Sequence, residues 1–388
     1  MKILHVINSL CSGGAEVFVA DLLIAQANQP GLEVALLTYA GILDHKGEEL
    51  ASMLSKRGIK QFHLEIRENR EKWRVPALFR KCIAGFEPDV IHSHMLQCDL
   101  FLVLGMIGFR RKPLLVRTLH DGWRSHMLPP SLQRWLGHRF HKIVGCSKSV
   151  MDFGEGVVSA DSFVNNGIAI QGDKRQDSQL PERRNEIRES LGLDDSECLL
   201  GCVGSLHGSG VSPRKGQDLV ILALSQLADE RIHVVFLGDG SLRMELESLA
   251  KREKVEKQCH FVGITDDVVG YLNAADAFML PSRSEGLSIA TIEAACSGLP
   301  LVLSSIPAFQ PFASSSTHYF ENGNSSDLAR IIRTLADDLV SFRELAGGNV
   351  PHYKNIFDIN RSASEYVGIY KSIKVMNGGR VALANGGN

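Results

Sequence analysis

The segment Ser282–Pro300 joins two carboxylates to the start of a helix, a pattern suited to a ligand that carries both hydroxyls and an anionic group. Ser288 can cap a helix that ends near Gly298, and the backbone N–H groups of its first turn would form an anion site. Glu293 lies inside this helix among apolar residues, so we expect its carboxylate to be buried. A buried carboxylate needs a partner, and we interpret Glu293 as accepting hydrogen bonds from adjacent ligand hydroxyls, such as those of a ribose. The alternatives are a structural ion pair and a carboxylate that reaches water.

Two cations, Arg214 and Lys215, precede a second expected helix, which begins near Gly216. Cations at a helix N-terminus gain nothing from the helix dipole, so the pair makes sense if an anion binds between them. A solvated basic loop is the alternative. Glu285 lies eight positions before Glu293, in the loop ahead of the first helix, and the spacing predicts that both carboxylates share one side of the site.

Two further motifs follow strand-like runs in the first half of the chain. Gly13 and Gly14 open a helix after the first run, where the missing side chains let the backbone approach a ligand; a simple tight turn is the alternative. A nicotinamide-binding fingerprint is excluded, because it needs G-x-G-x-x-G and an acidic residue after the second strand, and that strand ends at Thr38. His120 ends another run, although a lone histidine there is more often a surface residue.

Metal and disulfide sites are not indicated. His92 and His94 flank Ser93, but a zinc site needs a further ligand with suitable spacing, and the sequence offers none nearby. The cysteines form no C-x-x-C pair, so neither a zinc site nor a disulfide framework is expected and buried thiols in a reducing cytosol are the plain interpretation. They lie at Cys11, Cys82, Cys98, Cys146, Cys198, Cys202, Cys259 and Cys296.

These motifs need a frame of alternating strands and helices, and the apolar runs supply one. The runs are apolar throughout, as expected for parallel strands covered by helices on both faces. They are Lys2–Ile7, Glu33–Thr38, Gln61–Leu64, Asp89–His92, Leu114–Leu119 and Lys142–Gly145, then Cys198–Gly204, His233–Leu237, His260–Val262, Ala277–Leu280 and Leu301–Ser304. The sequence therefore predicts an α/β protein of two doubly wound domains in series, with ligands bound at the carboxyl ends of the strands.

The chain of 388 residues is long enough for two such domains. We expect an N-terminal domain over 1–170, a linker and the start of the second domain over 171–195, and a C-terminal domain over 196–356. The stretch from Gln171 to Asp195 is polar and is expected to be linker plus a solvated helix. A helix is expected over 357–375, and whether it packs back on the first domain stays open. Residues 376–388 are expected to form a disordered tail.

Charge is divided unevenly between the halves. Residues 1–150 hold 20 Lys+Arg against 13 Asp+Glu (+7), and the remainder holds 22 against 31 (−9). Much of the excess lies in 110–142, where basic residues are interleaved with Leu132, Trp135 and Leu136. Such a basic amphipathic region suits anionic lipid headgroups, or is a solvated face; nucleic acid is disfavoured because no recognition motif accompanies it. With no signal peptide or spanning segment, we expect a cytoplasmic protein, or one peripheral on the inner membrane.

The run E-G-L-S-I-A-T-I-E from Glu285 to Glu293 resembles the E-x7-E element of retaining glycosyltransferases with the GT-B fold, in particular glycosyltransferase family 4. The resemblance extends along the whole chain and implies two Rossmann-like domains facing across a cleft. It implies that Glu293 holds the nucleotide ribose and that Glu285 contacts the donor sugar. It also implies that the N–H groups of Gly286, Leu287 and Ser288 meet the sugar and the diphosphate.

The same resemblance gives roles to the other motifs. Arg214 and Lys215 would neutralise the donor diphosphate, Gly13 and Gly14 would lie against the donor, and His120 would reach the donor sugar. The pair His92 and His94 would line the acceptor side, and Asn166-Gly167 would be a structural turn. This chain departs from the family in one place, since many members carry Gly-Arg directly after the strand where it has Gly204-Ser205.

The implied reaction is transfer of a sugar from a UDP- or GDP-sugar to a hydroxyl of a glycan or lipid-linked glycan, with retention of the anomeric configuration. Catalytic roles would fall to His120, Glu285, Arg214 and Lys215. No metal is expected, because a convincing Asp-x-Asp is absent and the basic pair can neutralise the leaving group. The alternatives are a nucleotide-sugar epimerase or phosphorylase on the same scaffold, and a non-catalytic donor-binding partner of another transferase, which the departure at Ser205 motivates.

Overall fold

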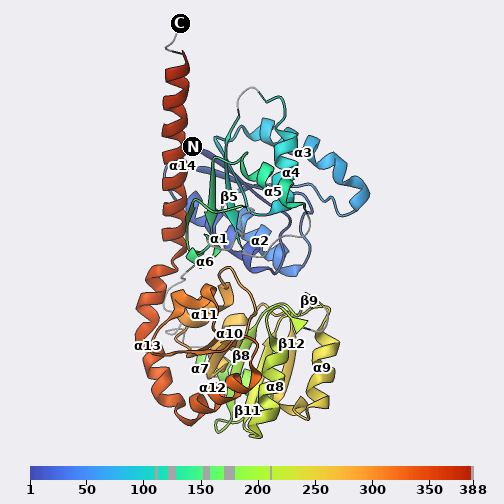
Figure 1. The fold of residues 1–388 in the computed structure, drawn as a ribbon, viewed down its shortest axis with the longest axis vertical. Helices are drawn as coiled ribbons and strands as arrows, with labels where there is room; N and C mark the ends of the chain where they lie inside the picture. Colours follow the sequence, from blue (N-terminus) through green and yellow to red (C-terminus); the bar gives the residue numbers. More distant parts are fainter. Residues whose placement is uncertain (110–111, 121–127, 152–157, 170–179, 210–211, 386–388) are drawn as a thin grey trace. The chain divides into compact units, whose positions relative to one another are not determined.

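The computed structural model divides into two compact units, each built on a parallel sheet covered by helices (Figure 1). The first unit comprises 1–169 and 357–388, and the second comprises 170–356. The structure describes residues 1–109, 112–120, 128–151, 158–169, 180–209 and 212–385. None of the helices in these ranges is both long and apolar enough to cross a membrane.

The sheet of the first unit has seven parallel strands in the order β3-β2-β1-β4-β5-β6-β7. The strands are β1 Lys2–Ile7, β2 Glu33–Thr38, β3 Lys60–His63, β4 Val90–Ser93, β5 Leu114–Leu119, β6 Lys142–Gly145 and β7 Ser162–Phe163. The helices are α1 Gly14–Ala27, α2 His45–Lys56, η1 Asn69–Arg74, α3 Val75–Phe86, α4 Leu96–Gly105, α5 Pro130–Gly137, α6 Lys148–Met151 and α14 Ile359–Asn385. The two faces of this sheet are covered differently: α3 and α4 pack on one, and α1 and α14 on the other.

Side chains that alternate along β1 show both covered faces. Leu4 and Val6 belong to the apolar cluster that contains Phe79 of α3 and Leu102 of α4. His5, between them, points to the opposite face and is wholly buried there. Because successive side chains of a strand face opposite ways, the α1 and α14 face holds a polar residue in the middle of the sheet.

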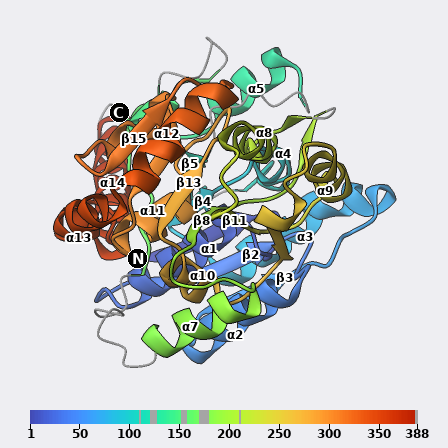
Figure 2. The same ribbon diagram turned by 90° about the horizontal axis from the view of Figure 1, so that it is seen from below.

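The second unit has six parallel strands in the order β12-β11-β8-β13-β14-β15, and a short antiparallel ribbon of β9 and β10. Its strands are β8 Cys198–Val203, β9 Gly208–Ser209, β10 Ser212–Pro213, β11 Ile232–Leu237, β12 Cys259–Gly263, β13 Ala277–Leu280, β14 Leu301–Ser304 and β15 Thr317–Phe320. Its helices are α7 Leu180–Ser190, α8 Gln217–Leu227, α9 Arg243–Arg252, η3 Glu256–Gln258, α10 Val268–Ala274, α11 Ile289–Cys296, η4 Pro307–Phe312, α12 Ser325–Asp337 and α13 Leu339–Ile356. Helices α8, α9 and α12 cover one face and α7 and α10 the other (Figure 2).

Helix α7 confirms the helix expected after the linker and is exposed along most of its length, but two of its arginines are held by the protein. Arg188 is 3% exposed and, with Arg184, binds the carboxylate of Asp276, which directly precedes β13. Arg343 of α13 binds the same carboxylate at 2.6 Å. Arg184 and Arg188 are therefore not solvated, because one buried carboxylate ties the first and last described helices of the second unit to its sheet.

The C-terminal helix α14 belongs to the first unit, and Tyr366 and Tyr370 are wholly buried in it. It continues to Asn385, whereas the sequence predicted an end at Val375 and a disordered tail. The physical reason is that no proline interrupts 376–385, and the two glycines at 378 and 379 weaken a helix without ending it.

Candidate active site

An ion pair between Lys215 and Glu285 joins two loops that follow neighbouring strands of the second unit. The Nζ of Lys215 lies 2.6 Å from Oε1 of Glu285, and the hydroxyl of Ser282 donates to the same oxygen at 2.6 Å. The lysine side chain is 14% exposed and the glutamate side chain 6%. The pair follows the carboxyl ends of β8 and β13, where open α/β sheets bind ligands.

The surroundings keep the Glu285 carboxyl ionised. Burial opposes ionisation, but the charges of Lys215 and Arg214 and the hydrogen bonds from Lys215 and Ser282 outweigh it, so the pKa of Glu285 is held below its usual value. A buried ionised carboxylate that accepts from a lysine and a hydroxyl is a fixed hydrogen-bond acceptor. It can receive further donors, such as sugar hydroxyls, on its remaining lone pairs.

Gly216 brings Lys215 into reach of Glu285. It adopts a left-handed conformation (φ +75°) as the N-cap of α8, and a Cβ there would fall 2.0 Å from the carbonyl oxygen of Pro281. The backbone on either side of the pair is therefore in direct contact, which only a glycine permits. The predicted helix start near Gly216 is confirmed, and the glycine also has a packing role that the sequence did not reveal.

Arg283 fastens the same two loops from the other side. Its backbone N–H donates to the carbonyl of Arg214 at 2.9 Å, and its guanidinium donates to the carbonyl of Pro213 at 2.7 Å. The guanidinium also pairs with both carboxylate oxygens of Asp218, at 2.9 and 2.7 Å. Bidentate pairs of this kind fix geometry as well as adding stability, so the basic loop and the carboxylate loop are held as one piece.

Helix α11 follows the carboxylate loop with the predicted cap. The Ser288 hydroxyl accepts from the N–H of Thr291 at 3.3 Å, which confirms the N-cap, and the helix ends two residues before Gly298. Glu293 corrects one expectation: it is half-buried, although its neighbours Ile292 and Ala294 are fully buried. The helix is apolar on most sides, but the carboxylate occupies the side that reaches the surface.

The glycine pair of the first unit lies at the start of α1 as expected, but a side chain of the protein fills the space beside it. Gly13 is the N-cap of α1 in an extended conformation, and a Cβ there would meet Oε2 of Glu16 at 2.2 Å. The Glu16 side chain therefore lies over Gly13, where a ligand was expected, and burial raises the pKa of its carboxyl. Gly14 begins the helix itself.

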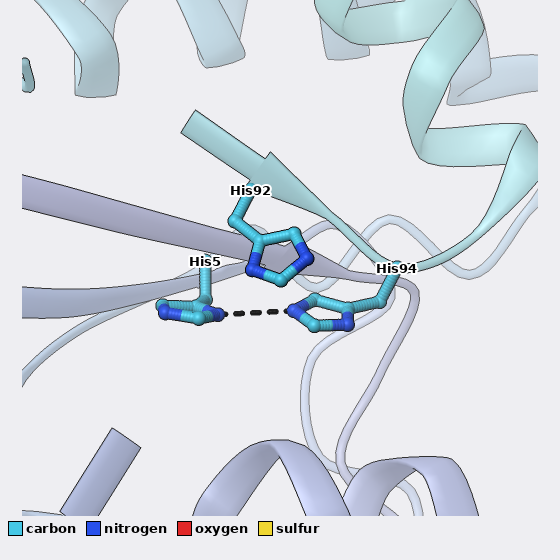
Figure 3. Close-up of side chains that lie close together, drawn as sticks. All are labelled: His5, His92 and His94. Atoms are coloured by element: carbon cyan, nitrogen blue, oxygen red, sulfur yellow. Dashed lines mark hydrogen bonds between the residues drawn. The ribbon is translucent and has the colours of Figure 1, made fainter. Parts of the chain in front are cut away.

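Four histidines gather behind the carboxyl ends of β1, β4 and β5. His120 follows β5, and its Nε2 lies 3.0 Å from Nδ1 of His94. His92 and His94 are 0 and 1% exposed, which contradicts the expectation that they line a substrate surface. The expectation that no third metal ligand lies near them is also wrong, since His5 of β1 joins them with one nitrogen of each ring within 4.8 Å of the others (Figure 3). The sequence missed His5 because it lies 87 positions away from His92 and meets it only through the pairing of β1 with β4.

One of the cations predicted for the basic region over 110–142 is buried and does not reach the surface. Arg117, in the middle of β5, is 8% exposed at its side chain and pairs with the buried Asp99 of α4 at 2.9 Å, so it does not contribute to a surface. Arg134, Trp135 and Arg139 are exposed, and the Arg139 guanidinium stacks 4.6 Å from the Trp135 ring. Three other members, at 110, 111 and 124, lie outside the described residues.

The predicted residues thus fall into two groups. The second unit contains Arg214, Lys215, Glu285, Gly286, Leu287, Ser288 and Glu293; the first contains Gly13, Gly14 and His120. Within the second unit, direct hydrogen bonds link the basic and carboxylate loops. Sequence reasoning missed Ser282, Arg283 and Asp218, although Arg283 stands inside the segment that carries Glu285.

Comparisons with known proteins place both units in one family. A model described as Glycosyltransferase Family 4 matches 12–164, and one described as Glycosyl transferases group 1 matches 197–338. An uncharacterized glycosyltransferase of Haemophilus influenzae is 30% identical over 287 residues, covering 72% of each chain. The O-antigen biosynthesis glycosyltransferase WclY of Escherichia coli is 23% identical over 388 residues, covering 96% of this chain and 99% of that one.

Solved structures agree in fold. The crystal structure of Anabaena HepE in complex with UDP and glucose superposes with a TM-score of 0.78 at 20% identity, covering 96% of this chain and 100% of that one. WaaG, a glycosyltransferase involved in lipopolysaccharide biosynthesis, superposes with a TM-score of 0.69 at 17% identity, covering 95% and 99%. The chain therefore belongs to glycosyltransferase family 4 and is a glycosyltransferase with the GT-B fold.

Proposed function

We propose that this glycosyltransferase moves a sugar from a nucleoside diphosphate sugar to a hydroxyl of a glycan or lipid-linked glycan, with retention of the anomeric configuration. The observation that carries the proposal is the ion pair of Lys215 with Glu285, which sets a cation and an ionised acceptor side by side after neighbouring strands. The diphosphate of a nucleotide sugar needs a cation, and the hydroxyls of its sugar need a hydrogen-bond acceptor. The pair of Lys215 and Glu285 therefore matches both parts of a nucleotide sugar.

The proposed donor pocket assigns one task to each element. Lys215 and Arg214 stabilise the negative charge that develops on the departing diphosphate, and the N-terminus of α11 adds its dipole. Glu285 accepts hydrogen bonds from hydroxyls of the transferred sugar. Glu293 accepts from the ribose hydroxyls, and its half-buried position leaves the carboxylate reachable by a ligand.

In the proposed reaction, the bond between the anomeric carbon and the diphosphate oxygen breaks, and the acceptor oxygen bonds to the same face of that carbon. The departing phosphate oxygen takes the acceptor's proton. Charges therefore balance without a covalent enzyme intermediate. The two basic side chains would carry the neutralisation that a divalent ion performs elsewhere, so we propose that turnover needs no metal, and that EDTA leaves the rate unchanged.

The donor class and acceptor class are proposed from relatives. UDP and glucose are named in the HepE complex, and O-antigen biosynthesis in the name of WclY. We therefore place UDP-sugars first among donors, ahead of GDP-sugars, and a cell-surface polysaccharide precursor as the acceptor.

The exposed face of α5 supports a further part of the proposal, a weak attachment to anionic membranes. Arg134 and Trp135 of α5 are exposed, as is Arg139 just beyond the end of the helix, and cations beside an aromatic ring suit a lipid headgroup layer. Flotation with vesicles of phosphatidylglycerol and phosphatidylethanolamine tests it. Arg134→Glu with Arg139→Glu should abolish binding, whereas Lys56→Glu on α2 should not. Equal binding by both variants, or no binding by the wild type, refutes the attachment.

Thermal shift against UDP-, GDP-, ADP- and dTDP-sugars without metal tests the donor pocket. A ligand at about 100 times its Kd adds roughly 2.7 kcal/mol to the native state. One nucleotide family should stabilise the wild type and the control Lys251→Met on exposed α9, but not Lys215→Met or Glu293→Ala. Stabilisation that survives in both site variants would refute the pocket. Incubation of the donor without acceptor separates the alternatives, because an epimerase would convert the sugar and a transferase would not.

A further inference from the structure

Eight polar side chains form one continuous hydrogen-bonded network on the α1 and α14 face of the first unit's sheet. His5 and His92 stand opposite each other on neighbouring strands, and His94 follows on the turn after β4 (Figure 3). The members are His5, Gln26, His92, His94, Thr118, His120, Tyr366 and Tyr370. Apart from His120, each is no more than 1% exposed.

One branch of the network runs from Gln26 to His120 through two histidines. Oε1 of Gln26 lies 2.8 Å from Nε2 of His5, Nδ1 of His5 lies 3.0 Å from Nε2 of His94, and Nδ1 of His94 lies 3.0 Å from Nε2 of His120. An amide oxygen only accepts, so Nε2 of His5 must donate. Its Nδ1 then accepts from His94, and His94 in turn accepts from His120. Each link fixes the next, and Nδ1 of His120 is left without a proton.

That last nitrogen has no hydrogen-bond partner among the described residues, although it is buried. Every other ring nitrogen of this branch is satisfied inside the protein. A buried polar atom without a partner is rare in native proteins and calls for an explanation. A lone pair in this position can accept a hydrogen bond from a hydroxyl and repels the oxygens of a phosphate or carboxylate.

The histidines stay neutral, which this directional chain requires. Burial lowers the pKa of His5 and of His120 to about 4, and it lowers the pKa of His92 and His94 well below the usual value. A neutral imidazole has one donor and one acceptor nitrogen, so it passes on the orientation of its neighbour. A protonated ring would donate from both nitrogens and interrupt the directional order of the hydrogen bonds.

The second branch begins at the other end of the Gln26 amide. Its Nε2 donates to the hydroxyl of Tyr370 at 3.4 Å, and this hydroxyl donates to Nδ1 of His92 at 2.6 Å. Nε2 of His92 then donates to Thr118 at 2.7 Å, and Thr118 bonds Tyr366 at 2.9 Å. Turning the Gln26 amide over would reverse both branches and place the proton of His120 on Nδ1. The orientation of one buried amide therefore selects the tautomer of a histidine three links away.

A metal ion at His5, His92 and His94 is the competing interpretation. All six ring nitrogens of these residues already have hydrogen-bond partners. No carboxylate bonds the three rings among the described residues, so nothing would offset the charge of a divalent cation in a fully buried site. The hydrogen-bonded chain explains every contact, and the metal would break several of them.

We propose that Gln26, His5 and His94 are positioning residues that hold His120 in its Nε2–H tautomer, so that Nδ1 accepts a hydrogen bond from a substrate hydroxyl. The part that names a sugar hydroxyl as the ligand rests on the proposed function. The tautomer itself does not, and it can be measured without substrate. The two statements can therefore fail separately.

NMR of the full chain labelled with ¹⁵N-histidine tests the tautomer directly. Two-bond proton–nitrogen correlations distinguish a protonated ring nitrogen from a bare one, and His120→Gln assigns the signals of that ring. In the wild type at pH 7.5, Nε2 of His120 should carry the proton and Nδ1 should be bare. Gln26→Met, which keeps the side-chain length but removes the amide, should give a mixture of both tautomers at His120.

Gln29→Met is the matched control, because Gln29 lies two residues beyond the end of the same helix and contacts α14 through Ser364 outside the network. Its spectrum should match the wild type. If Gln26→Met does not fold, Tyr370→Phe removes the hydroxyl that links the amide to the second branch and should produce the same mixing. A proton on Nδ1 in the wild type, or an unchanged tautomer in the folded variants, overturns the proposal. Equimolar binding of Zn²⁺ that shifts all three rings of His5, His92 and His94 also overturns it, in favour of a metal site.

A kinetic arm tests the substrate hydroxyl. Loss of one neutral hydrogen bond corresponds to about a 2- to 12-fold change, so Gln26→Met should raise the donor KM by about that factor with a smaller change in kcat, and Gln29→Met should change neither. If the tautomer mixes but KM stays constant, the positioning role stands and the sugar hydroxyl is the wrong ligand.

Discussion

Replacing Lys215 by methionine should separate the stability of the second unit from its donor affinity. The substitution keeps the length of the side chain but removes the cation that lies 2.6 Å from Glu285. Glu285 is 6% exposed, so its carboxylate would be left with Ser282 and Arg214 as partners. Breaking a buried pair on one side costs about 3–5 kcal/mol, and we expect the lower end because the Ser282 bond remains.

The double variant Lys215→Met with Glu285→Gln provides the decisive comparison. Removing both charges eliminates the unpaired carboxylate, so stability should recover to within about 1 kcal/mol of the wild type. Donor stabilisation should not recover, since both ligand-binding groups are gone. The control Lys251→Met on exposed α9 should change neither quantity.

The assay must distinguish the two units, and the distribution of tryptophan makes this possible. Trp73, Trp123 and Trp135 all belong to the first unit. Urea unfolding followed by far-UV circular dichroism reports on both units, and tryptophan fluorescence reports on the first. The loss in Lys215→Met should therefore appear in the dichroism and leave the fluorescence transition unmoved.

The pH dependence has a definite sign. In the wild type the pKa of Glu285 is lowered, so its contribution to stability is present above the unfolded pKa and is lost as the pH falls through the folded one. In Lys215→Met burial would raise that pKa, so the penalty should disappear as the carboxyl takes up a proton. The stability gap between the two proteins should narrow as the pH falls from 7 towards 4. A gap that is constant with pH, or a double variant as unstable as the single one, would refute the unpaired-carboxylate reasoning.

Three other perturbations give distinct results. Gly216→Ala should lower both the free energy of unfolding and the donor affinity. Gly192→Ala, at a similar φ of +74° but with open space around it, should lower the free energy of unfolding only by the backbone strain of about 1–2 kcal/mol. Equal effects would show that the contact with Pro281 is unimportant. Asp276→Asn should destabilise the second unit by about 3–5 kcal/mol in urea unfolding, because Arg188 is buried and loses its charge partner; a loss below 1 kcal/mol would mean that water compensates it. The first unit should lose stability as the pH falls from 6.5 to 4, because His5 and His120 are protonated in the unfolded chain over this range but stay neutral in the folded protein down to about pH 4. This difference amounts to about 3 kcal/mol per histidine. Unfolding followed by fluorescence should show a shallower dependence of stability on pH in His5→Asn, and an equal dependence would assign the effect to other groups.

Local signals in the sequence predicted the elements that depend on local chemistry. The bounds of β1, β2, β5, β6, β13 and β14 match the predicted runs, because apolar β-branched stretches bounded by turn residues define such strands. The Ser288 cap was also predictable, since capping involves residues three apart. The strand β15, by contrast, has the polar residues Thr317 and His318 on a sheet edge, and no run of apolar side chains marks it.

The candidate site divides in the same way. Arg214, Lys215 and Glu285 stood out because charges beside glycine are conspicuous in a sequence. The pair of Arg283 and Asp218, which holds their loops in place, did not stand out, because it depends on which strands are neighbours. The same is true of the contact between His5 and His92 in the first unit. Glu293 was predicted to be buried from the composition of its helix, but its accessible side follows from which face of α11 packs on the sheet.

The chain order of the two units has a consequence for how the protein is made. The second unit is continuous over 170–356, whereas the first is split and is completed only by α14. At about 5–20 residues per second, a ribosome takes roughly 10–40 s to pass through the intervening segment. During that time Gln26 and His92 lack the hydroxyl of Tyr370 and Thr118 lacks that of Tyr366. The face of the sheet that α1 and α14 share is then covered by α1 alone. The second unit, although later in the chain, can therefore complete its folding before the first unit, which has to wait for α14.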